Sequence, residues 1–590
     1  MPSKPSHLKI LLSEKRSLLA DLTRRFAAES RGLVLLLACL AGIAGGAIAS
    51  LMGRATVLIH HLLFNVPEGV RLSGGYLPRS LDILLWLTAG GVLLGISSLM
   101  WKRLGGGDIL DPIEANALYG GRMGNGGSLF VAGQAMLANG VGGSVGIEGG
   151  FTQLAAAVGS WLGRILNRPR EDLRLLVACG AAGAIAGAFD APFAGIAYAF
   201  ELILAAYSPN VLAPVVLASI AGKYAASLTA GHGYRIVLSG DLSAVDHSYL
   251  WAVAIGLLCG LFAIVLMYAV TMLEQLLART RIPGPLLTGA GGLATGAVAL
   301  LSPHVMGSGH GGIDYIFANS LGARVLATIF VLKLAACTFS IGSGFRGGLF
   351  SASLFLGALL GGAVGTPVIQ YGVMPDSALL GMQVVAMSAF GAAVVGTPLA
   401  MAILAAEITS RIGLMPEVLL GVITATLVVR VLFGYSFSIW RLHVRGSPAR
   451  SAADIAWSRS IQVRDIMRPD VVRFPDTATC GELLSRYPAG SIKWIALVNG
   501  ADHYAGLCDV SEIAFAAKDP GQPAADFARQ KTEVLYVAQT LEDAIKWFET
   551  PGREAAVVIN SPTRMGVVGI LTEAYVLKRY AQELERRRSV

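Results

Sequence analysis

The sequence predicts an all-α polytopic membrane domain, built from a duplicated unit of broken helices and followed by a small α/β domain. Hydrophobic residues make up 54% of the 590-residue chain and charged residues 14%, against about 25% charged in an average soluble protein. Several apolar stretches reach the roughly 20 residues that a membrane-crossing helix needs. After Trp440 these stretches end, and a charged pattern of short strands and helices continues.

The start of the chain is basic. Residues 1–30 are rich in Lys and Arg, and an apolar run over residues 32–53 follows them. The positive-inside rule therefore places the N-terminal segment 1–30 in the cytoplasm, and the C-terminus with it. We expect an integral protein of a plasma or bacterial inner membrane. Such basic flanks also account for the net charge of +8, and the sequence carries no nucleic-acid footprint.

Four further stretches are long and apolar enough to be predicted as membrane helices. They cover residues 81–101, 249–273, 285–301 and 325–342. Between them lie apolar segments of about 12 to 17 residues that Gly and Pro interrupt, too short to cross roughly 30 Å of hydrocarbon at 1.5 Å per residue. We expect half-helices there, because irregular backbone at membrane depth is tolerated only inside protein or beside water.

Two motifs occur twice in the same order. A P-x-A motif with Glu nine residues after the Pro is found at residues 192–201 and again at 398–407. A Gly-Gly pair before an apolar residue is found at residues 149–151 and 347–349. Duplicated units with broken helices are common in membrane transport proteins, whose sites lie where half-helix ends converge. The two predicted halves cover residues 31–230 and 249–440.

One carboxylate, Glu148, lies among glycines in an otherwise apolar stretch. A helix that begins at Gly149 or Gly150 directs free N–H groups and the positive end of its dipole at whatever precedes it, which makes an anion site. The segment Arg346–Phe350 supplies a matching helix start. Glu148 can then occupy the anion's place when ionised and leave it when protonated. The alternative is that Glu148 only caps a helix near a loop.

Residues 461–590 contain a second repeat. The segments 461–517 and 524–582 both read as strand, helix, strand, turn, strand and helix start, after a linker at 446–460. With "DIMRP" at its entry, this region resembles a tandem CBS-domain pair.

In such pairs an Asp of a T-x-x-D pattern often holds a nucleotide ribose. The equivalent positions here are Asp509 with Glu512, and Thr572 with Tyr575. Binding of an adenine nucleotide and a purely structural or dimer-forming role are therefore alternative hypotheses.

Over residues 31–445 the chain resembles the CLC family of chloride channels and proton-coupled chloride transporters. "GIEGG" corresponds to the family's G-[KR]-E-G-P motif and "GGLFS" to its G-x-F-x-P motif, although Ile147 replaces the basic residue, and Gly150 and Ala352 replace the two prolines. The resemblance implies an inverted repeat and a homodimer with one pore in each subunit. It also implies that Glu148 is the gate. The residues expected around the anion are Gly146, Ile147, Gly149, Gly348, Leu349 and Phe350.

The sequence also departs from the family pattern at the pore serine, the pore tyrosine and the inner glutamate. The pore serine corresponds to Gly106 or Asp108, and the pore tyrosine to Ser438. The inner proton-transfer glutamate of exchangers corresponds to Leu202, directly after Glu201. An aliphatic side chain cannot relay protons, so this departure favours passive conduction.

We therefore expect a passive chloride channel that Glu148 gates. The alternatives are a proton-coupled chloride exchanger, an exporter of fluoride or another anion, and a sensor that reads a ligand through the CBS pair. No nucleophile and base set or phosphate loop predicts an enzyme, and no residues have metal-ligand spacing. The expected partners are a small anion, protons, membrane lipid and a second copy of the chain.

Overall fold

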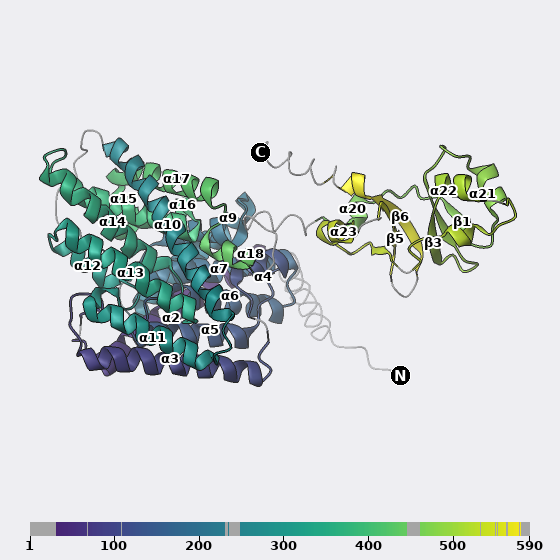
Figure 1. The fold of residues 1–590 in the computed structure, drawn as a ribbon. Helices are drawn as coiled ribbons and strands as arrows, with labels where there is room; N and C mark the ends of the chain where they lie inside the picture. The colour runs from purple at the N-terminus through teal and green to yellow at the C-terminus, as the bar shows by residue number, and fades with distance from the viewer. Residues whose placement is uncertain are drawn as a thin grey trace, which may run out of the picture. The chain divides into compact units, whose positions relative to one another are not determined.

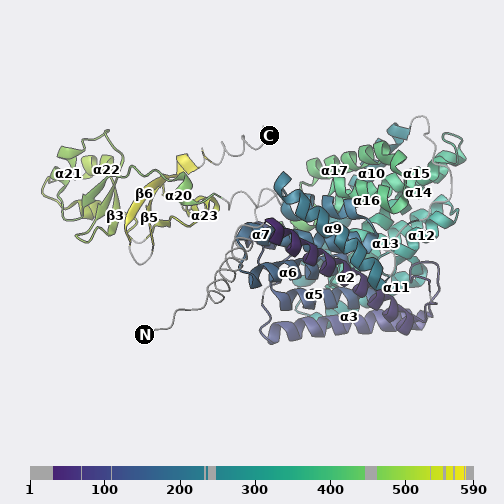
Figure 2. The same cartoon turned by 180° about the vertical axis from the view of Figure 1, so that it is seen from behind.

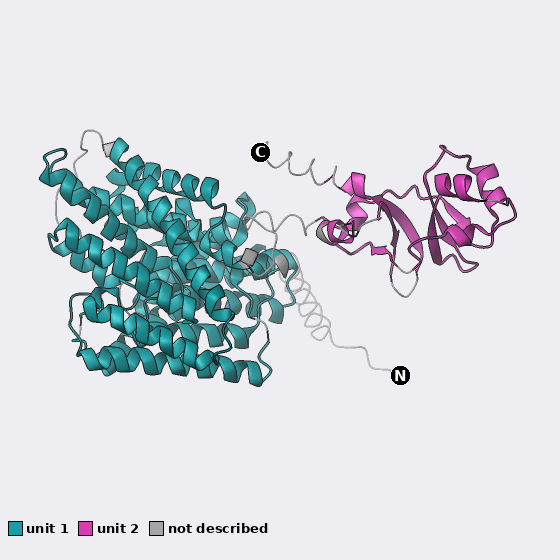
Figure 3. Ribbon diagram, in the orientation of Figure 1, with its two compact units in different colours: residues 1–453 teal, residues 454–590 magenta. Residues whose placement is uncertain are grey.

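The structure, a computed structural model, describes residues 31–444 and 461–579, apart from residues 68, 108, 231–233, 235, 237–247, 518, 532, 549, 551–552, 562–564 and 577–578. The predicted N-terminal segment 1–30 and the predicted linker 446–460 therefore lie outside the described residues. The chain divides into two compact units, residues 1–453 and residues 454–590, which Figure 3 colours separately.

Unit 1 is helical (Figure 1), and its helices form two successive halves. The first half contains α2 (Arg31–Phe64), α3 (Ser80–Arg103), α4 (Pro112–Leu118), α5 (Asn125–Gly140), α6 (Glu148–Ile165), α7 (Arg170–Phe189), α8 (Pro192–Tyr198), the π-helix η1 (Ala199–Leu204) and α9 (Pro209–Ala230). The second contains α10 (Ser248–Ala278), α11 (Gly284–Leu301), η2 (Pro303–Val305), α12 (His310–Ala318), α13 (Ala323–Ser343), α14 (Phe350–Gln370), α15 (Ala378–Val395), α16 (Pro398–Thr409), η3 (Ile412–Leu414) and α17 (Met415–Leu432). Helix α18 (Phe437–Val444) follows them.

Equivalent helices of the two halves make equivalent contacts. Helix α2 packs against α7 and α9, and α10 packs against α15 and α17. Helix α6 packs against α7 as α14 packs against α15. Helices α3 and α11 lie side by side and join the two halves (Figures 1 and 2). These contacts confirm the duplicated membrane unit that the two sequence motifs predicted.

Ten helices within the described residues are long and apolar enough to cross a membrane. They include the five stretches that the sequence predicted as spans, now seen as α2, α3, α10, α11 and α13. Small residues bring their backbones together. A Cβ atom at Gly46 in α2 would lie 1.9 Å from the carbonyl oxygen of Gly222 in α9, so this crossing tolerates only glycine.

The expectation of short half-helices holds for only some of the interrupted segments. The segments Pro192–Leu204 and Pro398–Thr409 are indeed short apolar helices. Helix α14, in contrast, runs unbroken for 21 residues and is long enough to span. The glycines of α14 do not break the helix. They allow a neighbouring helix to pack closely against it. A Cβ at Gly357 would lie 2.3 Å from the carbonyl oxygen of Ala386 in α15.

The two repeated glutamates hold the halves together reciprocally. The carboxylate of Glu201 accepts hydrogen bonds from the N–H groups of Leu399 and Ala400 at 2.9 and 2.8 Å, at the start of α16. The carboxylate of Glu407 accepts from the equivalent N–H groups at the start of α8, at 3.1 and 2.7 Å. Each carboxylate caps the helix of the other half, as an approximate two-fold relation between the halves requires.

Unit 2 consists of two small mixed sheets with short helices, visible in Figure 1. The first half contains α20 (Val463–Ile466), β1 (Arg473–Pro475), α21 (Cys480–Arg486), β2 (Trp494–Val498), β3 (Tyr504–Asp509) and α22 (Val510–Ala516). The second contains η4 (Ala524–Phe527), β4 (Leu535–Tyr536), α23 (Leu541–Phe548), β5 (Ala555–Ile559) and β6 (Val567–Thr572).

The two sheets have the same topology. In each, the middle strand pairs in parallel with the strand before it and antiparallel with the strand after it. Gly506 pairs with Leu497 in one sheet, and Gly569 pairs with Val558 in the other, each beside a shift of register. The segment that precedes each sheet pairs with the last strand of the other half, at Arg468 and Arg529. The two sequence repeats are thus two interlocked copies of one supersecondary unit.

Candidate functional site

Glu148 is the first residue of α6, and it is only 2% exposed. Its Oε1 atom accepts a hydrogen bond from the hydroxyl of Ser351, which lies one residue into α14 of the other half. The backbone N–H groups of Glu148 and Ser351 also lie close to this carboxylate. The carboxylate therefore interacts with the N-terminal ends of two helices, where N–H groups and dipoles favour negative charge.

The segments that lead into α6 and α14 are joined directly. The N–H of Gly146 donates to the carbonyl of Gly348 at 2.8 Å, and the N–H of Gly348 donates to the carbonyl of Gly146 at 2.9 Å. We expected both amides to face the anion, and in this arrangement neither is available to it. Among the described residues, the N–H groups of Gly149, Leu349 and Phe350 donate to no backbone carbonyl, so these amides remain as donors.

The backbone at Gly146 leaves room for the carboxylate of Glu148. A Cβ atom at position 146 would lie 1.8 Å from Oε2 of Glu148, well inside van der Waals contact. The glutamate side chain thus folds back over the backbone of Gly146. Because only glycine leaves this space open, the residue that bridges the two halves also permits the observed position of the carboxylate.

Two cavities approach Glu148 from different directions. The larger has a volume of about 620 Å³ and is lined by the C-terminal half of α2, by the loop after it and by residues 306–308, 310 and 311. The smaller has a volume of about 180 Å³ and is lined by the starts of α4, α6 and α18 and by the loop before α14. Among the described residues, Glu148 is the one that lines both. Its carboxylate therefore lies at the boundary between the cavities.

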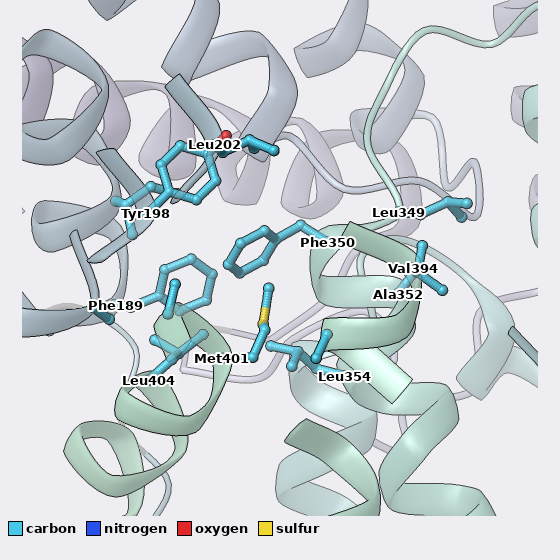
Figure 4. Close-up of a cluster of buried hydrophobic side chains, with 14 of the residues drawn as sticks. Phe189, Tyr198, Leu202, Leu349, Phe350, Ala352, Leu354, Val394, Met401 and Leu404 are labelled. Atoms are coloured by element: carbon cyan, nitrogen blue, oxygen red, sulfur yellow. The ribbon is translucent and has the colours of Figure 1, made fainter. Parts of the chain in front are cut away.

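Aromatic side chains close the space beside the glutamate. The ring of Phe350 packs between Phe189 and Tyr198, with ring centroids 5.3 and 6.2 Å apart (Figure 4). Phe189 lines the larger cavity, whereas Phe350 and Tyr198 line the smaller one. These three rings thus separate the two cavities next to Glu148. The carboxylate of Glu148 is the polar group at the boundary that they form.

The predicted anion residues are distributed unevenly over these cavities. Gly149, Gly348, Leu349, Phe350 and Ser438 line the smaller cavity with Glu148. Ile147 lines the larger cavity instead, on the other side of the carboxylate.

The structure describes only one of the two positions expected for the pore serine. Gly106 does not line either cavity, because it follows α3 and packs on the indole of Trp101, 2.3 Å from where its Cβ would be. Asp108 lies outside the described residues. The polar residue that reaches the smaller cavity from this segment is Asp111, the N-cap of α4, whose Oδ1 accepts from the N–H of Ile113 at 2.8 Å. An Asp directly before a Pro is a helix-start signal that could have identified it.

The two inner proton candidates have different environments. Leu202 is buried and lines the smaller cavity, but its side chain cannot titrate. Glu201 does not line it, and both of its carboxylate oxygens cap α16. Arg441 and the hydroxyl-bearing residues Thr152 and Tyr198 also line the smaller cavity, and no sequence motif predicted them there.

The candidate nucleotide residues of unit 2 already have protein partners. Oδ1 of Asp509 accepts from the N–H groups of Ser511 and Glu512 at 2.8 and 3.3 Å and so caps α22. The carboxylate of Glu512 pairs with Arg529 at 2.5 Å. Thr572 ends β6, opposite Ala555. These contacts account for two of the three side chains without a nucleotide.

Comparison with known proteins places these observations in a family. A family model described as "Voltage gated chloride channel" matches residues 90–430. A protein of Ralstonia nicotianae described as "Putative chloride channel protein ClcB-like" is 30% identical over 437 residues, which cover 72% of this chain and 98% of that protein. The voltage-gated ClC-type chloride channel ClcB of Salmonella typhimurium is 27% identical over 418 residues, covering 69% and 98%.

Solved structures share the fold. A slow cyanobacterial Cl⁻/H⁺ antiporter superimposes with a TM-score of 0.61 at 20% identity, covering 70% of this chain and 97% of the antiporter. A eukaryotic CLC transporter superimposes with a TM-score of 0.60 at 18% identity, covering 91% and 97%. The duplicated helical fold, the helix starts that meet at Glu148 and these matches establish that the chain is an integral membrane protein of the CLC family of chloride channels and transporters.

Proposed function

We propose that the membrane domain conducts chloride passively and that Glu148 is its gate. The observation that carries this proposal is that, among the described residues, Glu148 alone lines both cavities. When its carboxylate is ionised it occupies the boundary, and an anion that carries the same charge is excluded. When it is protonated or displaced, the same position offers an anion the hydroxyl of Ser351 and the free amides at the two helix starts.

The side of the membrane that each cavity faces follows from the first and last helices of the membrane domain. Helix α2 leaves the basic N-terminal segment at Arg31 and reaches the larger cavity with its last turns. Helix α18, which leads to unit 2, lines the smaller cavity. With both termini in the cytoplasm, the larger cavity faces outward and the smaller one inward. They are named the outer cavity and the inner cavity from here on.

The lack of an inner relay at the expected position supports passive transport. Leu202 stands in the inner cavity without a titratable group, and the carboxylate of Glu201 is engaged by α16. Curated relatives described as voltage-gated ClC-type chloride channels agree with this reading. We infer that chloride moves down its gradient and that protons act only on the gate.

A specific observation also favours proton-coupled exchange as a second candidate. Asp111 places a carboxylate in the inner cavity, on the cytoplasmic side of Glu148. The hydroxyl-bearing residues Tyr198 and Thr152 line the same cavity. Two solved relatives of the same fold are described as antiporters, one for chloride and one for fluoride. Asp111 is thus the inner proton site that an exchanger would use.

Flux from proteoliposomes with simultaneous recording of chloride and protons tests both candidates. Under a chloride gradient and no proton gradient, a passive channel moves chloride without driving protons uphill. Glu148→Gln is expected to keep the pathway open and to remove most of the pH dependence of flux. Uphill proton movement that both Glu148→Gln and Asp111→Asn abolish would replace the channel by the exchanger. Repeating the assay with fluoride identifies the preferred anion.

We also propose that residues 461–517 and 524–582 form tandem CBS modules and that two copies of the chain form a homodimer. The shared sheet topology of the two modules supports the first part. The caps and the ion pair at Asp509 and Glu512 favour a structural role over nucleotide binding. Titration of the full chain with ATP, followed by its thermal unfolding, tests this: a rise in unfolding temperature would indicate a nucleotide site.

A further inference from the structure

A continuous chain of hydrogen bonds connects the outer cavity to the gate. The hydroxyl of Ser308 lies 2.7 Å from Nδ1 of His310, and Nε2 of His310 lies 3.0 Å from the hydroxyl oxygen of Ser351. The hydroxyl of Ser351 in turn bonds the carboxylate of Glu148. Ser308 and His310 line the outer cavity, whereas Ser351 is fully buried.

The direction of every hydrogen bond in this chain is fixed by its last member. An ionised Glu148 only accepts, so Ser351 donates its hydroxyl hydrogen to Oε1. The oxygen of Ser351 then accepts from Nε2–H of His310, and the unprotonated Nδ1 accepts from the hydroxyl of Ser308. All donors point inward toward the gate, which is the arrangement that a proton needs to pass from the cavity to the carboxylate.

Charged and titratable groups surround the ring of His310 on several sides. Arg71 and the fully buried Lys333 are close enough to act on it electrostatically. The Tyr234 ring packs edge-on at 4.5 Å, and its hydroxyl donates to Asp314, one turn along α12. Two cations beside a buried ring oppose a lasting positive charge on it. The ring is therefore suited to passing a proton on rather than to holding one.

We propose that Ser308, His310 and Ser351 form a relay that protonates and deprotonates Glu148 from the outer cavity. This inference rests on the proposed gating role of Glu148 and adds the route by which the gate exchanges its proton. Ser351 also positions the gate, because its hydroxyl holds the ionised carboxylate at the boundary of the two cavities.

The relay step balances without a further reactant. A hydronium ion in the outer cavity gives a proton to the oxygen of Ser308, and the hydrogen of Ser308 moves to Nδ1 of His310. The hydrogen on Nε2 moves to the oxygen of Ser351, and the hydroxyl hydrogen of Ser351 moves to Oε1 of Glu148. The products are a water molecule, a neutral ring with its hydrogen on Nδ1 and a neutral carboxyl. Opening the gate and resetting it are the same transfers in opposite directions.

The test measures how fast chloride flux through the full chain in proteoliposomes responds to a jump in external pH. His310→Gln keeps groups that can donate and accept hydrogen bonds but cannot transfer a proton, so we expect a response about tenfold slower or more, with an unchanged final flux. Ser351→Ala removes both the relay and the hydrogen bond to the gate, so we expect a slow response and also a higher flux at neutral pH. His61→Gln is the matched control, since His61 lines the same cavity and contacts the carbonyl of Val66.

Two further measurements separate a relay from a structural role. Imidazole added outside is expected to restore a fast response in His310→Ala, because the truncated side chain leaves space that opens to the outer cavity. In a Glu148→Gln background, His310→Gln is expected to change nothing. A wild-type response time in His310→Gln, or an effect that persists in the Glu148→Gln background, would overturn the relay while Glu148 remained the gate. If Glu148→Gln itself kept the pH dependence of the wild type, the gate and the relay would both be refuted.

Discussion

The substitution Gly146→Ala is expected to open the gate without disturbing the fold. The added Cβ would lie 1.8 Å from Oε2 of Glu148, and the next atoms that it meets belong to the same carboxylate. A carboxylate at the end of a flexible side chain moves more easily than backbone, so the glutamate is displaced and not α6. Gly146 does not have a positive φ angle, so alanine fits the backbone there.

The size of the effect follows from the contact that is lost. Displacement of the carboxylate breaks its hydrogen bond with Ser351, and a hydrogen bond to a charged group contributes about 1.5–3 kcal/mol. The ratio of carboxylates at the boundary to displaced carboxylates would then fall roughly 10- to 150-fold. Chloride flux at neutral pH should rise toward the level of acidified wild type, and its pH dependence should flatten.

The assay compares chloride efflux from proteoliposomes at neutral and acidic external pH for wild type, Gly146→Ala and a control. Gly133→Ala is the control, because a Cβ at that position of α5 would meet nothing within 4 Å. If Gly146→Ala were well folded and kept the wild-type flux and pH profile, the observed position of Glu148 would not be the closed gate.

Two more predictions concern stability and reactivity. Glu201→Gln and Glu407→Gln should each weaken one pair of caps between the halves and lower the free energy of unfolding by about 1–2 kcal/mol, seen as similar decreases of thermal unfolding temperature in detergent. Clearly unequal decreases would contradict the reciprocal arrangement. Burial raises the pKa of the Cys508 thiol to about 12, so little thiolate exists at neutral pH and iodoacetamide should modify this residue only after unfolding. Rapid modification in the folded chain, read by mass spectrometry of the Cys508 peptide, would show that the strand opens.

The sequence by itself determined the class of the protein and its duplication, and it predicted Glu148 as the gate. Composition and long apolar stretches are enough to predict a membrane protein, because the bilayer imposes length and polarity on each helix separately. The position of Glu148 before a glycine-led helix is also a local property, since a helix start and its free N–H groups depend only on neighbouring residues. The repeated motifs added the second helix start.

The tertiary structure decided which groups meet around Glu148. Ser351 and His310 reach Glu148 from positions 203 and 162 residues away in the chain, and nothing in their own neighbourhoods identifies a partner for them. Asp111, rather than Gly106, reaches the inner cavity because Gly106 packs on the indole of Trp101 in the last turn of α3, whereas Asp111 caps the start of α4. These contacts depend on how helices of the two halves pack against one another, and a local pattern of residues does not contain that information.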